Sequence, residues 1–140
     1  MKKVLFLCTG NSCRSQMAEA IVNARLGGEW QAASAGTKPA GYLHPKALAA
    51  LAEIGIRHEG RSKLAGEFQG VDFDLVVTVC DSAAEDCPIW LPAPGPQGAG
   101  GMGKKVHHSF FDPAKTDDMD DFRAVRDEIA REMVQLLSNS

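Results

Sequence analysis

A cysteine and an arginine near the N-terminus have the types and spacing of a loop that binds a tetrahedral oxyanion. Five residues separate Cys8 from Arg14, and Ser15 follows directly. A cysteine thiolate is a strong nucleophile, and a guanidinium offers two parallel N–H donors that fit two oxygens of one ion. We therefore predict that Cys8 attacks an oxyanion held by Arg14, and that the Ser15 hydroxyl donates a hydrogen bond to the thiolate.

The residues inside this loop favour backbone amides that turn inward. They are Thr9, Gly10, Asn11, Ser12 and Cys13. Glycine and asparagine tolerate left-handed backbone conformations, which let successive N–H groups converge on an anion. The N-terminus of a helix that begins at Ser15 would add positive potential, and such surroundings lower a cysteine pKa from about 8.5 to roughly 3.5–7.5. We predict that residues 9–14 bind the oxyanion, while the Cys13 side chain points into the core.

Apolar runs alternate with amphipathic segments along the chain, which predicts a parallel sheet covered by helices. Strands are expected at residues 3–8, 31–34, 73–80 and 104–109. Helices are expected at residues 15–26, 45–55 and 116–137. In the last helix, Thr116 is the expected N-cap, and the expected buried face comprises Phe122, Val125, Ile129, Met133 and Leu136. We predict one α/β domain over residues 1–140, with a four-stranded parallel sheet flanked by helices on both faces.

Composition narrows the class of partner. The net charge is −3, and no block of basic residues suggests a nucleic-acid or membrane surface. The apolar run from Val4 to Cys8 is too short for the core of a signal peptide, so we expect a cytoplasmic protein. We also expect it to be a monomer. In a reducing cytosol, Cys8, Cys13, Cys80 and Cys87 are expected to be catalytic, metal-binding or buried.

Three motifs resemble those of the thioredoxin-coupled arsenate reductases that have the low-molecular-weight protein tyrosine phosphatase fold. They are Cys-Thr-Gly-Asn-Ser-Cys-Arg-Ser at 8–15, Val-Thr-Val-Cys with Cys-Pro seven residues on at 77–88, and Phe-Asp-Pro-Ala at 111–114. The resemblance implies this fold, arsenate as substrate, reduced thioredoxin as electron donor and no bound cofactor. It spans almost the whole chain.

The resemblance also implies a role for each motif residue. Cys8 attacks arsenic, and Asp112 protonates the leaving oxygen. Cys80 then attacks Cys8, arsenite is released, and Cys87 resolves the disulfide to form Cys80–Cys87 for thioredoxin. Independently of the resemblance, a residue before proline is restricted to extended conformations, which would hold Asp112 outward from its loop.

Some relatives hold a potassium ion behind the loop with residues that match Asn11, Glu19 and Ser34. Where those relatives have an acidic residue, this chain has Lys63. An ammonium at that position could replace the ion, so we predict no metal.

The spacing of Cys80 and Cys87 sets a geometric condition on their disulfide. If residues 80–87 form a helix, the two Cα atoms lie about 10 Å apart, whereas a disulfide needs roughly 4.4–6.8 Å. We hypothesise that this segment unwinds on oxidation. Equal amide-exchange protection of residues 81–88 in both redox states would contradict the hypothesis.

Two other functions and one other electron donor remain open at this stage. A phosphatase would use Cys8, Arg14 and Asp112 identically, although no aromatic residue follows the Asp-Pro pair to hold a phosphotyrosine ring. A zinc module could use Cys80, Cys87, His107 and His108, but structural zinc sites usually have closer cysteine pairs. Glutathione with glutaredoxin is the alternative donor, and it would make Cys87 less necessary.

Overall fold

The computed structural model describes residues 2–68, 71–79 and 104–138. Its elements, in chain order, are β1 (Lys2–Cys8), α1 (Arg14–Arg25), β2 (Trp30–Gly36), α2 (Pro45–Glu53), the 3-10 helix η1 (Ala65–Phe68), β3 (Leu75–Thr78), β4 (Lys104–His107), the 3-10 helix η3 (Pro113–Lys115) and α4 (Met119–Ser138). The strands and the three α-helices follow one another in the order that the sequence predicted.

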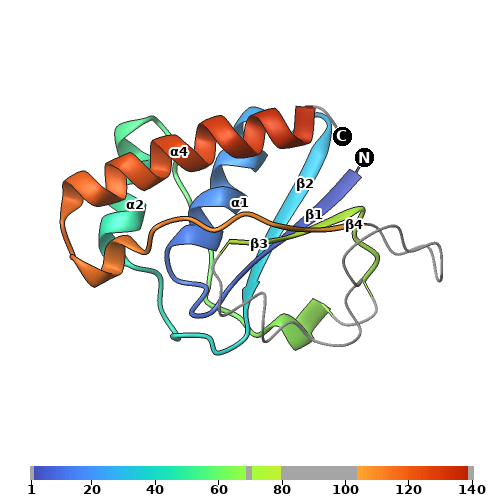
Figure 1. Ribbon diagram of the computed structural model, residues 1–140, viewed down its shortest axis with the longest axis horizontal. Coiled ribbons are helices and arrows are strands. Elements are labelled where there is room, and N and C mark those ends of the chain that lie inside the picture. The colour runs from blue at the N-terminus through green and yellow to red at the C-terminus, as the bar shows by residue number, and fades with distance from the viewer. Residues whose placement is uncertain (1, 69–70, 80–103, 139–140) are drawn as a thin grey trace.

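The four strands form one parallel sheet in the order β2-β1-β3-β4, which confirms the predicted sheet (Figure 1). Strand β1 is central, and Val4 to Leu7 are completely buried because both faces of the strand are covered. In register, Cys8 lies opposite Gly36 and Leu7 opposite Thr78. Parallel strands bring their carboxyl ends to one edge of the sheet, which is where residues that follow β1 and β3 can meet.

Helices α1, α2 and α4 gather on one side of the sheet (Figure 1). Their apolar faces supply much of the core, including Met17 and Ile21 of α1. In α4, four of the five residues predicted to be buried are buried, but Leu137 takes the place of Leu136. Leu137 is four residues after Met133, one helical turn further along the same face. No helix in the described ranges is long and apolar enough to cross a membrane.

The start of α4 differs from the prediction. Thr116 is not its N-cap: it ends η3, its hydroxyl donates to the Pro113 carbonyl, and α4 begins only at Met119. Asp117, between them, has a left-handed φ of 54°, which interrupts helical geometry. The Asp118 carboxylate accepts from the Asp120 amide at 2.8 Å and so caps the helix instead.

Strand β3 ends at Thr78, two residues before the predicted end. Residues 80–103 lie outside the described part of the chain. Cys80, Cys87 and the segment between them, whose unwinding we hypothesise, therefore have no structural description, and neither does most of the Pro/Gly-rich stretch at 92–104.

Candidate oxyanion site

The predicted anion loop lies between the end of β1 and the start of α1. Asn11 has a left-handed φ of 49°, as its residue type predicted. Cys8 is 3% exposed at the end of the strand. Cys13 is the N-cap residue of α1, but its side chain makes no capping bond, so the first-turn amides remain available to a bound anion.

The segment after β2 holds the loop from outside. Its amides donate to four outward carbonyls of the loop: Thr37 to Cys8 (3.2 Å), Lys38 to Thr9 (2.9 Å), Ala40 to Gly10 (2.8 Å) and His44 to Ser12 (2.8 Å). In a trans peptide, the carbonyl and the following N–H point in opposite directions. Carbonyls that are tied outward therefore turn the amides of residues 9, 10, 11 and 13 inward. We refer to residues 37–44 as the outer segment.

Gly36 provides the surface on which the loop rests. A Cβ built at Gly36 would lie 2.5 Å from the Thr9 carbonyl oxygen and 3.1 Å from the Asn11 amide nitrogen. The Gly36 amide donates to the Lys63 carbonyl at 2.8 Å. The backbone of the loop thus approaches the end of β2 so closely that only glycine fits.

Asn11 is completely buried and is held by its side chain. Its Oδ1 accepts from the Lys63 amide (3.0 Å) and from Gln16 Nε2 (2.9 Å), and its Nδ2 donates to Ser15 Oγ (2.8 Å). Ser15 Oγ acts as acceptor in this last bond, so its own proton is available for donation. These bonds offset the cost of the left-handed conformation at Asn11.

Arg14 and Asp112 come together although 97 residues separate them in the chain. Arg14 Nη1 donates to the Phe110 carbonyl at 3.1 Å, and Nη2 lies 3.6 Å from Asp112 Oδ2. Arg14 Nε is buried and has no hydrogen-bond partner among the described residues. A buried N–H without a partner is costly. The edge formed by Nε and Nη2 is therefore the edge that can receive two oxygens of a bound ion.

Asp112 has the extended backbone expected of a residue before proline, with φ −86° and ψ 102°. Its Oδ1 accepts from the Ala114 amide at 3.1 Å, which caps η3. Its Oδ2 faces Arg14. The structure thus brings Asp112 to Arg14 of the anion loop, as the resemblance implied.

Cys13 differs chemically from Cys8. Burial raises the pKa of the Cys13 thiol to about 12; the nearby Asp112 carboxylate adds to this rise, and Arg14 opposes it. Cys13 is 4% exposed, which confirms the prediction that its side chain points into the core. A neutral thiol is a poor nucleophile, so Cys13 can contribute only its backbone to the loop.

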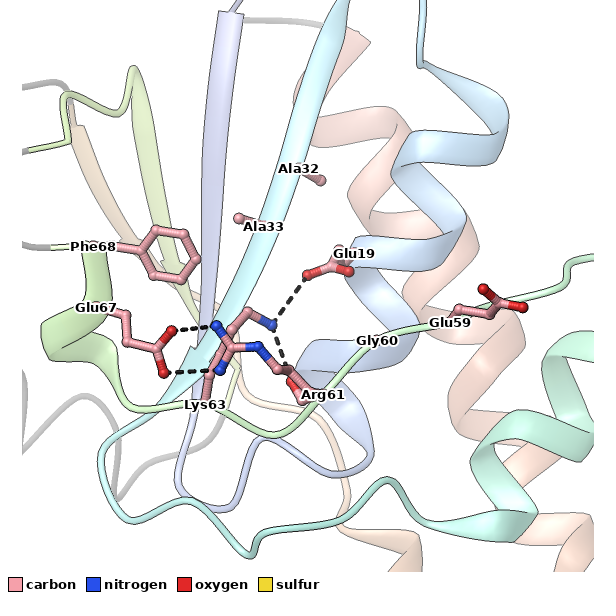
Figure 2. A pocket seen from close by; sticks show the side chains of 9 residues that line it. All are labelled: Glu19, Ala32, Ala33, Glu59, Gly60, Arg61, Lys63, Glu67 and Phe68. Carbon is pink, nitrogen blue, oxygen red and sulfur yellow. Dashed lines mark hydrogen bonds and ion pairs between the residues drawn. The ribbon is translucent and has the colours of Figure 1, made fainter.

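Behind the loop lies an open hollow of about 600 Å³ (Figure 2). The Lys63 ammonium lies there, 3.8 Å from Glu19 Oε1, one of the residues that match the potassium site of some relatives. Ser34 Oγ donates to the same Glu19 oxygen at 2.8 Å. Burial lowers the pKa of Lys63, although Glu19 opposes the change. Among the described residues, no group of three or more His, Cys, Asp or Glu side chains could hold a metal.

Gln16 and His58 belong to this network, and the sequence analysis missed both. His58 Nε2 lies 2.7 Å from Gln16 Oε1 and 3.7 Å from Glu19 Oε2. Burial lowers the pKa of His58. A signal for Gln16 did exist: it is a large polar residue beside the apolar face of α1, between Ser15 and Met17. Nothing in the sequence indicated His58.

The two histidines of the alternative zinc site have other contacts. His107 Nδ1 lies 2.7 Å from Thr78 Oγ1. His108 stacks on Phe110 with ring centroids 4.6 Å apart, and its Nε2 lies 3.7 Å from Glu132. These contacts give both residues a structural role in holding the end of β4.

Comparisons with known proteins point to one family. Residues 3–140 match the family described as low molecular weight phosphotyrosine protein phosphatase. "Arsenate reductase 2" of Staphylococcus epidermidis is 43% identical over 129 residues, which cover 91% of this chain and 90% of that protein. A solved structure of an arsenate reductase in the oxidized state has a TM-score of 0.81 at 28% identity and covers 99% of this chain and 98% of its own.

A low molecular weight protein tyrosine phosphatase from T. tengcongensis is also similar. Its TM-score is 0.78 at 28% identity, with complete coverage of both chains. The fold is therefore shared by reductases and phosphatases, and the identity of the reaction must come from residues.

Proposed function

Because this chain belongs to the low molecular weight phosphotyrosine protein phosphatase family, we propose that it is a cytoplasmic arsenate reductase built on the phosphatase fold. The observation that carries the proposal is the 43% identity to an arsenate reductase over nine-tenths of both chains. The pairing of Cys8 with Arg14 and Asp112 supports it, since this arrangement suits a tetrahedral oxyanion. Cys80 and Cys87 are present in the sequence to supply electrons.

The first step forms a bond between sulfur and arsenic. The inward amides of residues 9–14 and the Nε–Nη2 edge of Arg14 hold arsenate with its arsenic facing Cys8. The Cys8 thiolate attacks arsenic, and an As–O bond breaks as Asp112 protonates the leaving oxygen, which departs as water. Ser15 stabilises the thiolate by a hydrogen bond. Arsenic is still As(V) at this point.

Electron transfer follows in two exchanges. The Cys80 thiolate attacks the Cys8 sulfur, the S–As bond breaks with its electron pair on arsenic, and arsenite leaves as As(III). Cys87 then attacks Cys80, which frees the Cys8 thiolate and leaves a Cys80–Cys87 disulfide. The dithiol of thioredoxin supplies the two electrons that restore both thiols. No bound cofactor or metal takes part in this proposal, and the enzyme acts as a monomer.

Phosphomonoester hydrolysis is the second candidate, favoured by the similarity to the T. tengcongensis phosphatase. It would use Cys8, Arg14 and Asp112 in the same positions and would not need Cys80 or Cys87. Ala114 and Lys115 follow the Asp-Pro pair, and the only tyrosine of the chain is Tyr42. These residues favour slow side activity over recognition of phosphotyrosine.

A donor-swap assay tests both functions. Arsenate turnover is measured with thioredoxin and with glutathione plus glutaredoxin, on wild type and on Cys8→Ser, Cys80→Ser and Cys87→Ser. Cys8→Ser should abolish reductase and phosphatase activity. Cys80→Ser and Cys87→Ser should lose multiple turnover with thioredoxin and keep phosphomonoester hydrolysis. Full arsenate turnover in both of these variants would refute the reductase mechanism and leave the oxyanion loop intact.

A further inference from the structure

The oxyanion site has two parts, the anion loop and the turn that carries Asp112, and the reaction requires a fixed distance between them. Arg14 of the loop contacts the second part directly. The anion loop comes from residues 8–15, whereas Asp112 belongs to the turn that precedes α4. Arg14 contacts both Phe110 and Asp112. However, Arg14 must also bind the oxyanion, so its Nη2 cannot hold Asp112 unchanged through the reaction. A tether that does not touch the substrate would solve this problem.

Such a tether lies outside the pocket, between the start of α2 and the turn before α4 (Figure 1). Lys46 Nζ lies 2.9 Å from Asp117 Oδ1 and donates to the Asp117 carbonyl at 2.5 Å. His44 Nε2 lies 3.5 Å from the same Asp117 carboxylate oxygen. We refer to His44, Lys46 and Asp117 as the outer bridge.

At one end, the outer bridge is joined to the anion loop through His44. The His44 amide donates to the Ser12 carbonyl at 2.8 Å. The Nδ1 atom of the His44 ring accepts a hydrogen bond from the Lys46 amide at 3.2 Å. In the neutral ring, the proton is therefore on Nε2, which faces Asp117. The His44 ring packs against the Phe122 ring of α4, with centroids 4.6 Å apart and the planes tilted by 39°. His44 is thus fixed on three sides.

At the other end, the outer bridge is joined to the turn of Asp112. The Asp117 amide donates to the Pro113 carbonyl at 3.0 Å, and Pro113 directly follows Asp112. Asp117 has a φ of 54°, a left-handed conformation that is uncommon for residues other than glycine, although aspartate and asparagine adopt it more often than most. Since one ammonium binds both its carboxylate and its carbonyl, Lys46 stabilises this conformation. The turn is thereby held in the form that directs Asp112 toward Arg14.

We propose that Lys46 and Asp117 are positioning residues, which keep Asp112 in register with the anion loop while Arg14 binds the oxyanion. The inference rests on the proposed role of Asp112 as the acid. It adds two residues that touch neither the substrate nor Cys8. Their effect should appear in the chemical step and not in oxyanion binding.

The test measures single-turnover release of arsenite from pre-reduced enzyme, at saturating arsenate and without thioredoxin, for Lys46→Met, Lys46→Arg and Asp117→Asn. Methionine keeps the length of the lysine side chain, and asparagine tolerates the left-handed conformation. The ion pair is partly exposed, so we expect a rate about two- to fivefold lower in Lys46→Met and Asp117→Asn. The double variant should lose no more than either single one, because both changes remove one interaction. Lys46→Arg should keep most of the wild-type rate.

Two further measurements distinguish positioning from general stability. The arsenate concentration for half-saturation and the rate of Cys8 alkylation by iodoacetate should stay within twofold of wild type. The control is Arg123→Met, which removes ion pairs of Arg123 with Glu53 of α2 at 2.9 Å and with Asp120 of α4 at 2.8 Å, neither of which involves the Asp112 turn. Arg123→Met should keep the wild-type rate of arsenite release.

The results separate the inference from the function on which it rests. Asp112→Asn is the reference variant: if it keeps the wild-type rate, the acid role itself is wrong. If Asp112→Asn is slow but Lys46→Met and Asp117→Asn are unchanged, the outer bridge does not position Asp112. An equal loss in Arg123→Met would assign the effect to helix packing and would also overturn the inference.

Discussion

Replacing Gly36 with alanine tests whether the end of β2 supports the anion loop. The new methyl group would stand 2.5 Å from the Thr9 carbonyl oxygen, whereas Cβ contacts below 3.0 Å are essentially never found. The gap must therefore widen by about 0.5 Å. The obstacle is backbone on both sides: Thr9 belongs to the loop, and the Gly36 amide is bonded to Lys63. No flexible side chain can move away to relieve the contact.

The magnitude follows from the two consequences of this shift. Forcing one extra methyl group into a closely packed site costs about 1–3 kcal/mol of unfolding free energy. Displacing the Thr9 carbonyl also rotates the following amide, which is one of the inward donors. A displacement on the order of 1 Å at a reaction centre can cost about a hundredfold in rate. For half that displacement, we expect arsenate turnover to fall by about tenfold.

The assay compares Gly36→Ala with Gly28→Ala. Gly28 has no atom within 4 Å of a built Cβ, so the second variant makes the same chemical change in open space. Urea unfolding, phosphate affinity and single-turnover arsenite release are measured for both. Gly28→Ala should match wild type in affinity and rate. If Gly36→Ala also bound phosphate normally and kept its rate, the loop would not depend on close contact with β2.

Three other changes have outcomes that the structure predicts. The Cys13 pKa rises from 9.0 to about 12 on folding, so the free energy of unfolding should fall by up to about 4 kcal/mol as the pH rises through this range. In urea unfolding at pH 8 and at pH 10.5, Cys13→Ala should therefore lose less stability between the two pH values than wild type does. Gln16 Nε2 donates to the Asn11 backbone carbonyl at 3.1 Å, and Gln16→Leu removes this bond. Stability should then fall by about 1–3 kcal/mol, and phosphate should bind more weakly. Unchanged phosphate affinity would contradict a role for Gln16 in holding the anion loop. Arg126→Met removes a bond to the buried Ala50 carbonyl at 2.9 Å and should cost about 1–3 kcal/mol in urea unfolding while leaving phosphate affinity unchanged.

The sequence predicted the sheet and the main helices because their signals are local. The apolar run from Val4 to Leu7 could only be a covered strand, and Pro45 begins α2 as expected of a proline in the first turn. The N-cap of α4 was wrong because two candidates, Thr116 and Asp118, are close together. The choice between them depends on the positive φ of Asp117, which is stabilised by Lys46, 71 residues away in the chain.

The residues of the candidate site also fall into those with a local sequence signal and those without one. Cys8, Arg14 and Asn11 could be predicted because they lie within one short loop, and Asp112 because its motif resembles that of a known family. The outer segment and Gly36 could not, because they act by lying next to the loop in space. Their contacts with the loop are backbone bonds or depend on a missing side chain, and neither leaves a pattern of residue types. His58 could not either, because its partners Gln16 and Glu19 are far from it in the chain.

The place of β1 at the centre of the sheet has a consequence for biosynthesis. Of the four strands, β1 is synthesised before the others, yet one of its neighbours, β3, begins only at Leu75, and α4, which packs on α1, begins only at Met119. Contacts of such large sequence separation slow folding, because the intervening chain must be ordered before they form. As the nascent chain leaves the ribosome, the Cys8 thiol should therefore stay exposed to cellular oxidants until late in synthesis, and rapid completion of the chain would protect it.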